Sequence, residues 1–284
     1  MGWGHYSVDD RAARAASVGY STKSAREIFT QRNISKAMNP HGVTVRESRD
    51  SADHPNSVAI ILALDVTGSM GSIPHHLVKE GLPTIMGRII QSGTPDPQLL
   101  FLAVGDHECD SCPLQVGQFE SSDELLDKWL TDVYLEGGGG GNAGESYLLA
   151  WYFAGFHTST DCLEKRRQKG FLFTIGDEPT LSEIPANSLA KLMGGQQQSW
   201  SAVELLDRAR NHYHVFHLHI RETSSGSRQE VMDGWKQLMG DHLIILPQHE
   251  EVSRVIPEII ATTLRKDTVA QAAAGALPQT KVLL

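Results

Sequence analysis

The sequence predicts a doubly wound α/β fold, in which a mostly parallel sheet carries helices on both faces and one short antiparallel edge strand. Two observations lead to this prediction. Apolar runs rich in β-branched residues recur along the chain, which is typical of strands buried on both faces. Segments with apolar residues at helical spacing alternate with these runs, as in chains of β-α units.

The first half of this pattern begins at residue 57. SVAIILALD, residues 57–65, reads as a buried strand, and residues 77–90 follow with helical spacing interrupted by Pro83. LLFLAVGD, residues 99–106, reads as a second buried strand. The next segments are a short edge strand within residues 113–119 and a helix over residues 121–130, with Ser122 as its expected N-cap.

The second half repeats the alternation after a glycine-rich segment at residues 136–146. We expect helices at 147–156, 201–210 and 231–239, and strands at 170–176, 212–220 and 242–247. Ser201 and Glu204 have capping-box spacing, and Pro257 is expected to open a last helix. These elements divide the chain into an N-terminal extension (1–56) packed on the main domain, an α/β domain (57–266) and a C-terminal tail (267–284).

Composition limits the function classes. The 284 residues carry a net charge of −9, so binding to phosphate backbones is not expected. No stretch approaches the ~20 apolar residues of a membrane span. Three cysteines do not suggest a disulfide framework, and the N-terminus lacks the apolar region of a secretory signal. We therefore expect a cytoplasmic protein.

Oxygen-bearing side chains follow almost every predicted strand. Asp65, Thr67 and Ser69 follow the first strand, and Asp177 follows the strand at 170–176. Asn142 and Glu145 follow the glycine run. Because ligands of open parallel sheets bind at the carboxyl ends of the strands, we expect these groups to converge. Oxygen donors of this kind suit Mg²⁺, Mn²⁺ or Ca²⁺.

Two helix-capping alternatives compete with this metal-site hypothesis. Asp65, Thr67 and Ser69 are ordinary N-cap residue types, although one cap needs only one of them. Asn142 and Glu145 have the spacing of a capping box before an apolar helix, so they could serve only to cap it. Five consecutive glycines favour a close backbone approach at a functional site instead.

DVTGSM, residues 65–70, resembles the Asp-x-Ser-x-Ser motif of the metal-ion-dependent adhesion site (MIDAS) in von Willebrand factor A (VWA) domains. The resemblance covers about residues 57–265 and extends to GGGGGNAGES and FLFTIGDEP. It implies a Rossmann-like fold and a divalent cation, expected to be Mg²⁺, held by Asp65, Thr67, Ser69 and Asp177. Thr67 replaces the motif's first serine. The second-loop ligand stays open between Asn142 and Glu145.

The resemblance also implies a function. A MIDAS binds a partner protein by leaving one coordination position of the ion for a Glu or Asp of that partner. The chain is therefore expected to be a protein-binding module and not an enzyme. Intracellular bacterial members of this family often work beside MoxR-type AAA+ ATPases, which implies an adaptor or chaperone-like scaffold role with such a partner.

Other residue patterns indicate weaker alternatives. DVTGS also resembles the DxDxT motif of haloacid-dehalogenase-like phosphatases, with Asp65 as the phosphoryl-accepting nucleophile; Thr67 cannot then supply the second carboxylate. HECDSC, with His107, Cys109 and Cys112, offers too few ligands for a zinc site. The histidines of HYHVFHLH, residues 212–219, are expected at a strand end or on the surface.

Overall fold

The computed structural model describes residues 6–19, 22–77, 82–135 and 144–275. Its centre is a six-stranded sheet with the strand order β10-β9-β6-β2-β3-β4. Only the edge pair β3–β4 is antiparallel, and the other four pairs are parallel. The predicted fold class, including its antiparallel edge strand, is confirmed. The strands of this sheet are β2 (Val58–Asp65), β3 (Pro97–Val104), β4 (Leu114–Val116), β6 (Gly170–Gly176), β9 (Tyr213–Ile220) and β10 (Leu243–Leu246).

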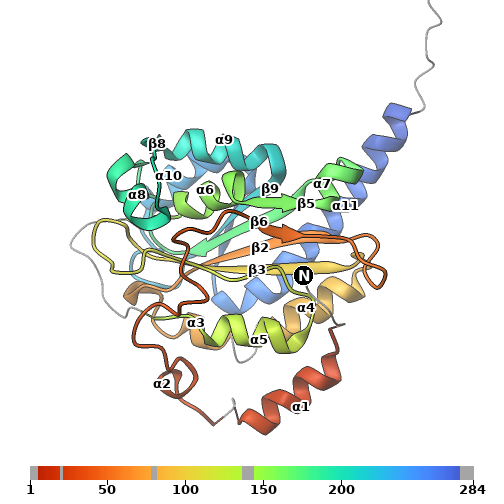
Figure 1. Ribbon diagram of the computed structural model, residues 1–284, viewed down its shortest axis with the longest axis horizontal. Coiled ribbons are helices and arrows are strands. Elements are labelled where there is room, and N and C mark those ends of the chain that lie inside the picture. The colour runs from red at the N-terminus through yellow and green to blue at the C-terminus, as the bar shows by residue number, and fades with distance from the viewer. Residues whose placement is uncertain (1–5, 20–21, 78–81, 136–143, 276–284) are drawn as a thin grey trace, which may run out of the picture.

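Helices cover both faces of this sheet (Figure 1). The strands are buried on both faces because alternate residues feed two cores: Ile60 and Leu62 of β2 lie in one, and Ile61 and Ala63 in the other. The helices on the first face are α3 (Ile73–His76), α4 (Leu82–Gln91), α5 (Asp123–Thr131) and α11 (Val252–Gly275). Those on the second are α6 (Leu148–Phe156), α7 (Asp161–Arg166), α8 (Ala186–Met193), α9 (Ala202–His212) and α10 (Gln229–Met239).

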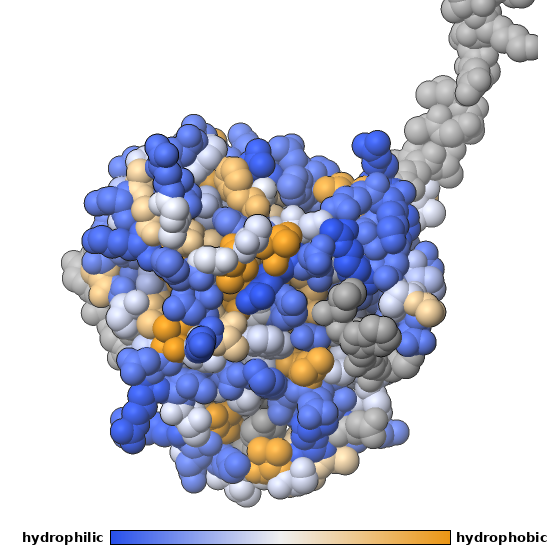
Figure 2. Space-filling view, viewed as in Figure 1, coloured by the Kyte–Doolittle hydropathy of each residue, from blue (hydrophilic) through white to orange (hydrophobic). Residues whose placement is uncertain are grey.

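The face seen in Figure 2 is mostly hydrophilic, with apolar groups scattered in small patches. The buried apolar side chains form two cores, one on each face of the sheet. None of the helices within the described ranges has an apolar stretch long enough to cross a membrane.

The N-terminal segment packs against the α/β sheet and its helices. Helix α1 (Val8–Val18) lies against α4 and α5, and Arg11 forms a buried ion pair with Asp127 at 3.1 Å. Helix α2 (Ala25–Ile28) is short, and β1 (Arg46–Ser48) pairs in parallel with β5 (Thr158–Thr160). A further small pair, β7 (Glu183–Ile184) with β8 (Trp200–Ser201), is antiparallel.

The last helix differs from the sequence-based expectation. Pro257 was expected to open it, but α11 begins at Val252 and contains Pro257 in its second turn. Val252, Ile256 and Ile260 are all buried at helical spacing, so packing on the sheet outweighs the hydrogen bond that proline cannot donate. The helix also continues to Gly275, past the predicted domain end at residue 266.

Candidate functional site

The predicted site residues that follow strands β2 and β6 meet at the carboxyl edge of the sheet. Strands β2 and β6 are parallel neighbours, with Leu64 opposite Ile175, so Asp65 and Asp177 leave the edge side by side. Both aspartates are fully buried. This is the edge at which open α/β sheets bind ligands.

Hydrogen bonds join four of the predicted residues into one chain. Asp65 Oδ1 accepts from the backbone N–H of Thr67 at 2.9 Å and from its hydroxyl at 2.7 Å. The Thr67 and Ser69 hydroxyls are 3.1 Å apart. The Ser69 hydroxyl donates to Asp177 Oδ1 at 2.9 Å. The sequence-distant carboxylates are thereby linked through the two hydroxyls of the motif.

The capping alternative for DVTGS is wrong. Thr67 occupies the N-cap position of the 3-10 turn Gly68–Met70, but its side chain makes no capping hydrogen bond. Ser72, the N-cap of α3, makes none either. The hydroxyls of Thr67 and Ser69 are directed to carboxylates instead of helix N–H groups.

Glu145 joins the same group, and it does not cap the following helix. Helix α6 begins only at Leu148, with Tyr147 as its N-cap residue. The backbone of Glu145 is held beside the segment after β6, donating to the Pro179 carbonyl at 2.8 Å and accepting from Leu181 N–H at 2.9 Å. Its side chain is buried and hydrogen-bonds with Thr67. Asn142, the alternative second-loop ligand, lies outside the described residues.

We call Asp65, Thr67, Ser69, Glu145 and Asp177 the strand-end site. Buried carboxyl groups, shielded from solvent, dominate the electrostatics of this site. Burial, followed by the charge of Asp177, raises the pKa of Asp65 to about 7. Burial, followed by the charges of Asp65, Asp110 and Asp106, raises the pKa of Glu145 to about 9. The strongest electrostatic effects on both groups come from other carboxylates and not from a basic side chain.

Several carboxylate oxygens at the site lack a partner within the described part of the chain. Asp177 Oδ2 and Glu145 Oε2 are buried without a hydrogen bond, as is Oδ2 of neighbouring Asp106. Such groups cost free energy unless something compensates them. A hard divalent cation fits this all-oxygen donor set of carboxylates and hydroxyls. Asp65, Glu145 and Asp177 do not all approach within 4.8 Å of one another, so these three carboxylates alone do not form a close ligand group.

Tyr147 supports the site and was not anticipated from the sequence. Its hydroxyl donates to Asp65 Oδ2 at 2.7 Å, so both oxygens of Asp65 are occupied. Gly176 makes room for it, because a Cβ there would meet the Tyr147 oxygen at 1.8 Å. The sequence indicated Tyr147 only as the first residue of the helix expected at 147–156. Its role depends on contacts with Asp65 of β2 and Gly176 of β6, which are distant in the sequence.

The weaker zinc signal stays unsupported within the described chain. His107 Nδ1 lies 2.8 Å from the Ser146 hydroxyl, Cys109 is exposed, and these residues do not form a close ligand group with Cys112. Cys162 is buried in the core of the second face.

The expectation that the histidines of residues 212–219 lie at a strand end or on the surface is wrong for His217 and His219. His212 ends helix α9, and His217 and His219 are completely buried. His217 stacks on Trp235 with ring centroids 3.5 Å apart, and its Nδ1 lies 2.9 Å from the Thr174 hydroxyl. Burial lowers the pKa of His217 well below its usual value. The ring therefore belongs to the hydrophobic core under the site.

This burial predicts a pH dependence of stability. The unfolded chain protonates His217 near pH ~6.5, whereas the native state keeps it neutral to lower pH. Its contribution is therefore present above that pH and is lost as the pH falls below it. We expect His217→Phe to reduce the loss of unfolding free energy between pH 6.5 and 5 by up to about 1.4 kcal/mol per pH unit. Urea titrations with chelator measure the change in unfolding free energy with pH. His41→Phe, at an exposed position, is the control. Equal pH slopes for His217→Phe and wild type would contradict the assignment of this pH dependence to His217.

No family model matches the sequence, and no curated protein matches it. Solved structures do resemble the fold. The pilus adhesin SpaC from Lactobacillus rhamnosus GG, in its open conformation, matches with a TM-score of 0.50 and 10% identity over 78% of this chain and 31% of the adhesin. The chain thus spans about a third of the adhesin's length.

Two further solved structures show weaker likeness. The SpRpn10 VWA domain matches with a TM-score of 0.42 and 13% identity, covering 70% of this chain and 93% of that domain. Proximal thread matrix protein 1 from the mussel byssus matches with a TM-score of 0.42 and 10% identity, over 72% of this chain and 47% of that protein. At 10% identity, the likeness to the pilus adhesin concerns the fold alone.

Proposed function

We propose that the chain is a divalent-metal-dependent protein-binding module of the VWA type. The observation that carries this proposal is the buried, uncompensated cluster of carboxylates at the strand-end site. Asp177 Oδ2 and Glu145 Oε2 have no hydrogen-bond partner in the described chain, and the neighbouring charges are of the same sign. A bound cation would offset both the free-energy cost of the unpaired buried oxygens and the repulsion between the carboxylates.

The residues of the strand-end site divide into two roles in this proposal. Thr67 and Ser69 offer hydroxyls, and Asp177 and Glu145 offer carboxylate oxygens, as ligands for Mg²⁺, with Mn²⁺ and Ca²⁺ as alternatives. Asp65 orients the loop, because its two oxygens are occupied by Thr67 and Tyr147. The bound ion would supply an electrostatic attraction for a Glu or Asp side chain of a partner protein.

The geometry does not favour the phosphatase alternative. Asp65 is fully buried and accepts hydrogen bonds on both oxygens, so neither oxygen is presented for attack on a phosphate. Thr67 has no carboxylate for general acid–base catalysis. We therefore propose a binding protein without catalytic activity. A MoxR-type AAA+ ATPase as partner, and a cytoplasmic location, belong to the proposal through the motif resemblance alone.

Magnesium binding should stabilise the wild type and not Asp65→Asn. Mg²⁺ at about 100 times its Kd is expected to add about 2.7 kcal/mol to the unfolding free energy, seen as a rise in Tm over the chelated protein. Asp65→Asn disturbs the Thr67 and Tyr147 contacts that set the loop, so its Mg²⁺ response should fall sharply. Asp241→Asn, at a fully exposed aspartate at the other end of the sheet, is the matched control.

The same protein samples decide between the two function classes. Turnover of a generic phosphomonoester that depends on Asp65 would overturn the binding-module proposal. Stabilisation by Mg²⁺ without turnover supports it. A pull-down with and without chelator then shows whether a partner protein is held through the ion.

A further inference from the structure

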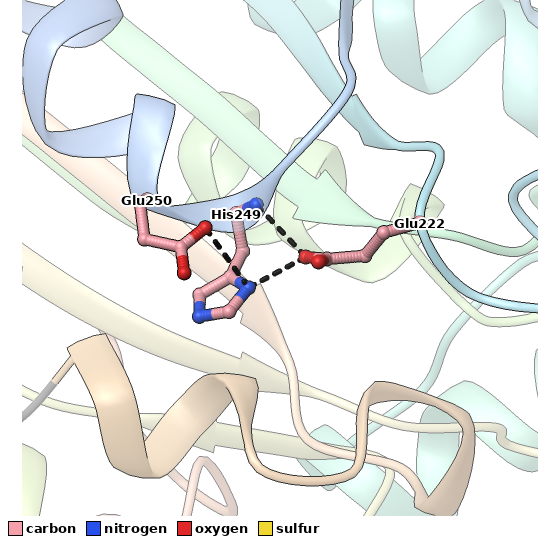
Figure 3. A group of neighbouring side chains, drawn as sticks. All are labelled: Glu222, His249 and Glu250. Atoms are coloured by element: carbon pink, nitrogen blue, oxygen red, sulfur yellow. Dashed lines mark hydrogen bonds and ion pairs between the residues drawn. The ribbon is translucent and has the colours of Figure 1, made fainter.

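A second group of potential metal ligands lies at the same edge of the sheet, at the ends of strands β9 and β10, and β9 is the neighbour of β6. Glu222 follows β9 and His249 follows β10, which is its parallel neighbour with Leu246 opposite Ile220. Glu250 is the next residue along the chain. Figure 3 shows the three side chains turned toward one another from these two loops. This group shares no residue with the strand-end site.

The distances within the group suit one small cation. One ligand atom from each of Glu222, His249 and Glu250 lies within 4.8 Å of the others. His249 Nδ1 lies 2.5 Å from Glu222 Oε1 and 3.6 Å from Glu250 Oε2. Tetrahedral ligands at about 2.0–2.2 Å from one ion lie about 3.3–3.6 Å from one another. The distance from Nδ1 to Glu250 already fits, whereas Nδ1 and Glu222 Oε1 would have to move apart by about 1 Å to admit the ion.

Two of the three side chains are oriented without any ion. Glu222 Oε1 also accepts from the backbone N–H of His249 at 2.8 Å, which ties the two loops together. The His249 ring meets His76 of α3 edge-on, with centroids 4.6 Å apart. The His249 and Glu222 side chains are 14% and 22% exposed, whereas Glu250 is 56% exposed. The group is therefore a partly buried pair with one open side for water ligands.

We propose that Glu222, His249 and Glu250 form a second divalent-metal site, selective for a transition metal such as Zn²⁺ or Co²⁺. The imidazole of His249 distinguishes the metal preference of this site from that of the strand-end site. The strand-end site offers oxygen donors only, which suit Mg²⁺, whereas an imidazole nitrogen with two carboxylates suits Zn²⁺ and its neighbours in the first transition row. In the proposed complex the ion lies between Nδ1 and Glu222, where the two groups now hydrogen-bond to each other, and the remaining ring hydrogen lies on Nε2.

Zinc uptake in excess Mg²⁺ tests the proposal. Equilibrium dialysis of the full chain should give one Zn²⁺ per wild-type chain, with an affinity at least ~10-fold lower in His249→Gln. Glu222→Gln keeps an oxygen for the His249 N–H and should also bind more weakly. Co²⁺ supplies a second readout: its visible absorption should appear in wild type and be lost in His249→Gln, with circular dichroism confirming that the variants are folded.

Three comparisons locate the site. Asp177→Asn should keep full Zn²⁺ binding, so failure of the strand-end site and failure of this site are distinguishable. His41→Gln, at an exposed histidine elsewhere, should also keep it. The proposal is overturned if wild type binds no Zn²⁺, if His249→Gln binds as tightly as wild type, or if uptake disappears instead in the double variant Cys109→Ser, Cys112→Ser.

Discussion

Glu145→Gln is expected to make the metal-free protein more stable and to remove most of its response to Mg²⁺. In the native chain, burial and neighbouring carboxylates raise the pKa of Glu145 to about 9. In the unfolded chain a glutamate has a pKa of about 4.3. The native state therefore holds one more proton between these values, and the wild type loses stability as the pH rises through that window.

Glutamine is neutral in both states, so it is not subject to this loss. The advantage of Glu145→Gln over wild type should be absent near pH 4 and grow by up to about 1.4 kcal/mol per pH unit between about pH 4.3 and pH 8. Urea unfolding with chelator measures the unfolding free energy at each pH, and the same titrations with Mg²⁺ measure the response to the ion.

Glu120→Gln is the matched control for Glu145→Gln. Glu120 is also buried with a raised pKa, but it pairs with Leu99 near the start of β3, at the opposite edge of the sheet. Its neutralisation should leave the Mg²⁺ response intact. A destabilised Glu145→Gln that still responds fully to Mg²⁺ would show that Glu145 is a structural residue and not part of a metal site.

Gly176→Ala is expected to destabilise the protein by about 3 kcal/mol, even though glycine here needs no unusual backbone angle. The added Cβ would lie 1.8 Å from the Tyr147 oxygen and 2.6 Å from its Cζ. Tyr147 is fully buried, so the ring has little room to retreat. Its displacement would also break the 2.7 Å hydrogen bond to Asp65, so Mg²⁺ binding should weaken together with stability.

Two further variants isolate this contact. Gly234→Ala in α10 meets nothing within 4 Å and should be neutral or stabilising by up to about 1 kcal/mol. Tyr147→Phe removes the hydroxyl oxygen that would clash with the new Cβ at position 176. The double variant with Gly176→Ala should therefore lose less unfolding free energy than the sum of the losses of the two single variants. Strict additivity in urea unfolding, or a loss at Gly176 no greater than at Gly234, would argue against the close approach.

The sequence predicted those parts of the site that follow directly from strand ends. An apolar run that stops at Asp65 has its carboxyl end at the sheet edge, and a parallel neighbour brings Asp177 to the same edge. Local patterns are sufficient there, because strand direction and pleat place the side chains. The capping box of Ser201 and Glu204 is confirmed for the same reason, since its hydrogen bonds lie within four residues.

Features that depend on long-range packing were not predictable in this way. Tyr147 and Asp65 are 82 residues apart in the chain, and nothing near position 147 indicates their contact. The burial of His217 depends on Trp235 from a helix that follows β9. Pro257 was given its usual position at a helix start, whereas the apolar face of α11 extends the helix back to Val252.

Helix α11 runs from the carboxyl edge of the sheet past its amino edge. It starts beside His249, whose partner Glu222 follows the carboxyl end of β9, and its Asp267 contacts His214 at the amino end of the same strand, at 2.9 Å. The eight residues that follow Asp267, ending at Gly275, extend about 12 Å farther, toward the upper right of Figure 1. A partner protein bound at the proposed strand-end site would therefore lie at the opposite end of the molecule from the tip of α11 and would not obstruct it.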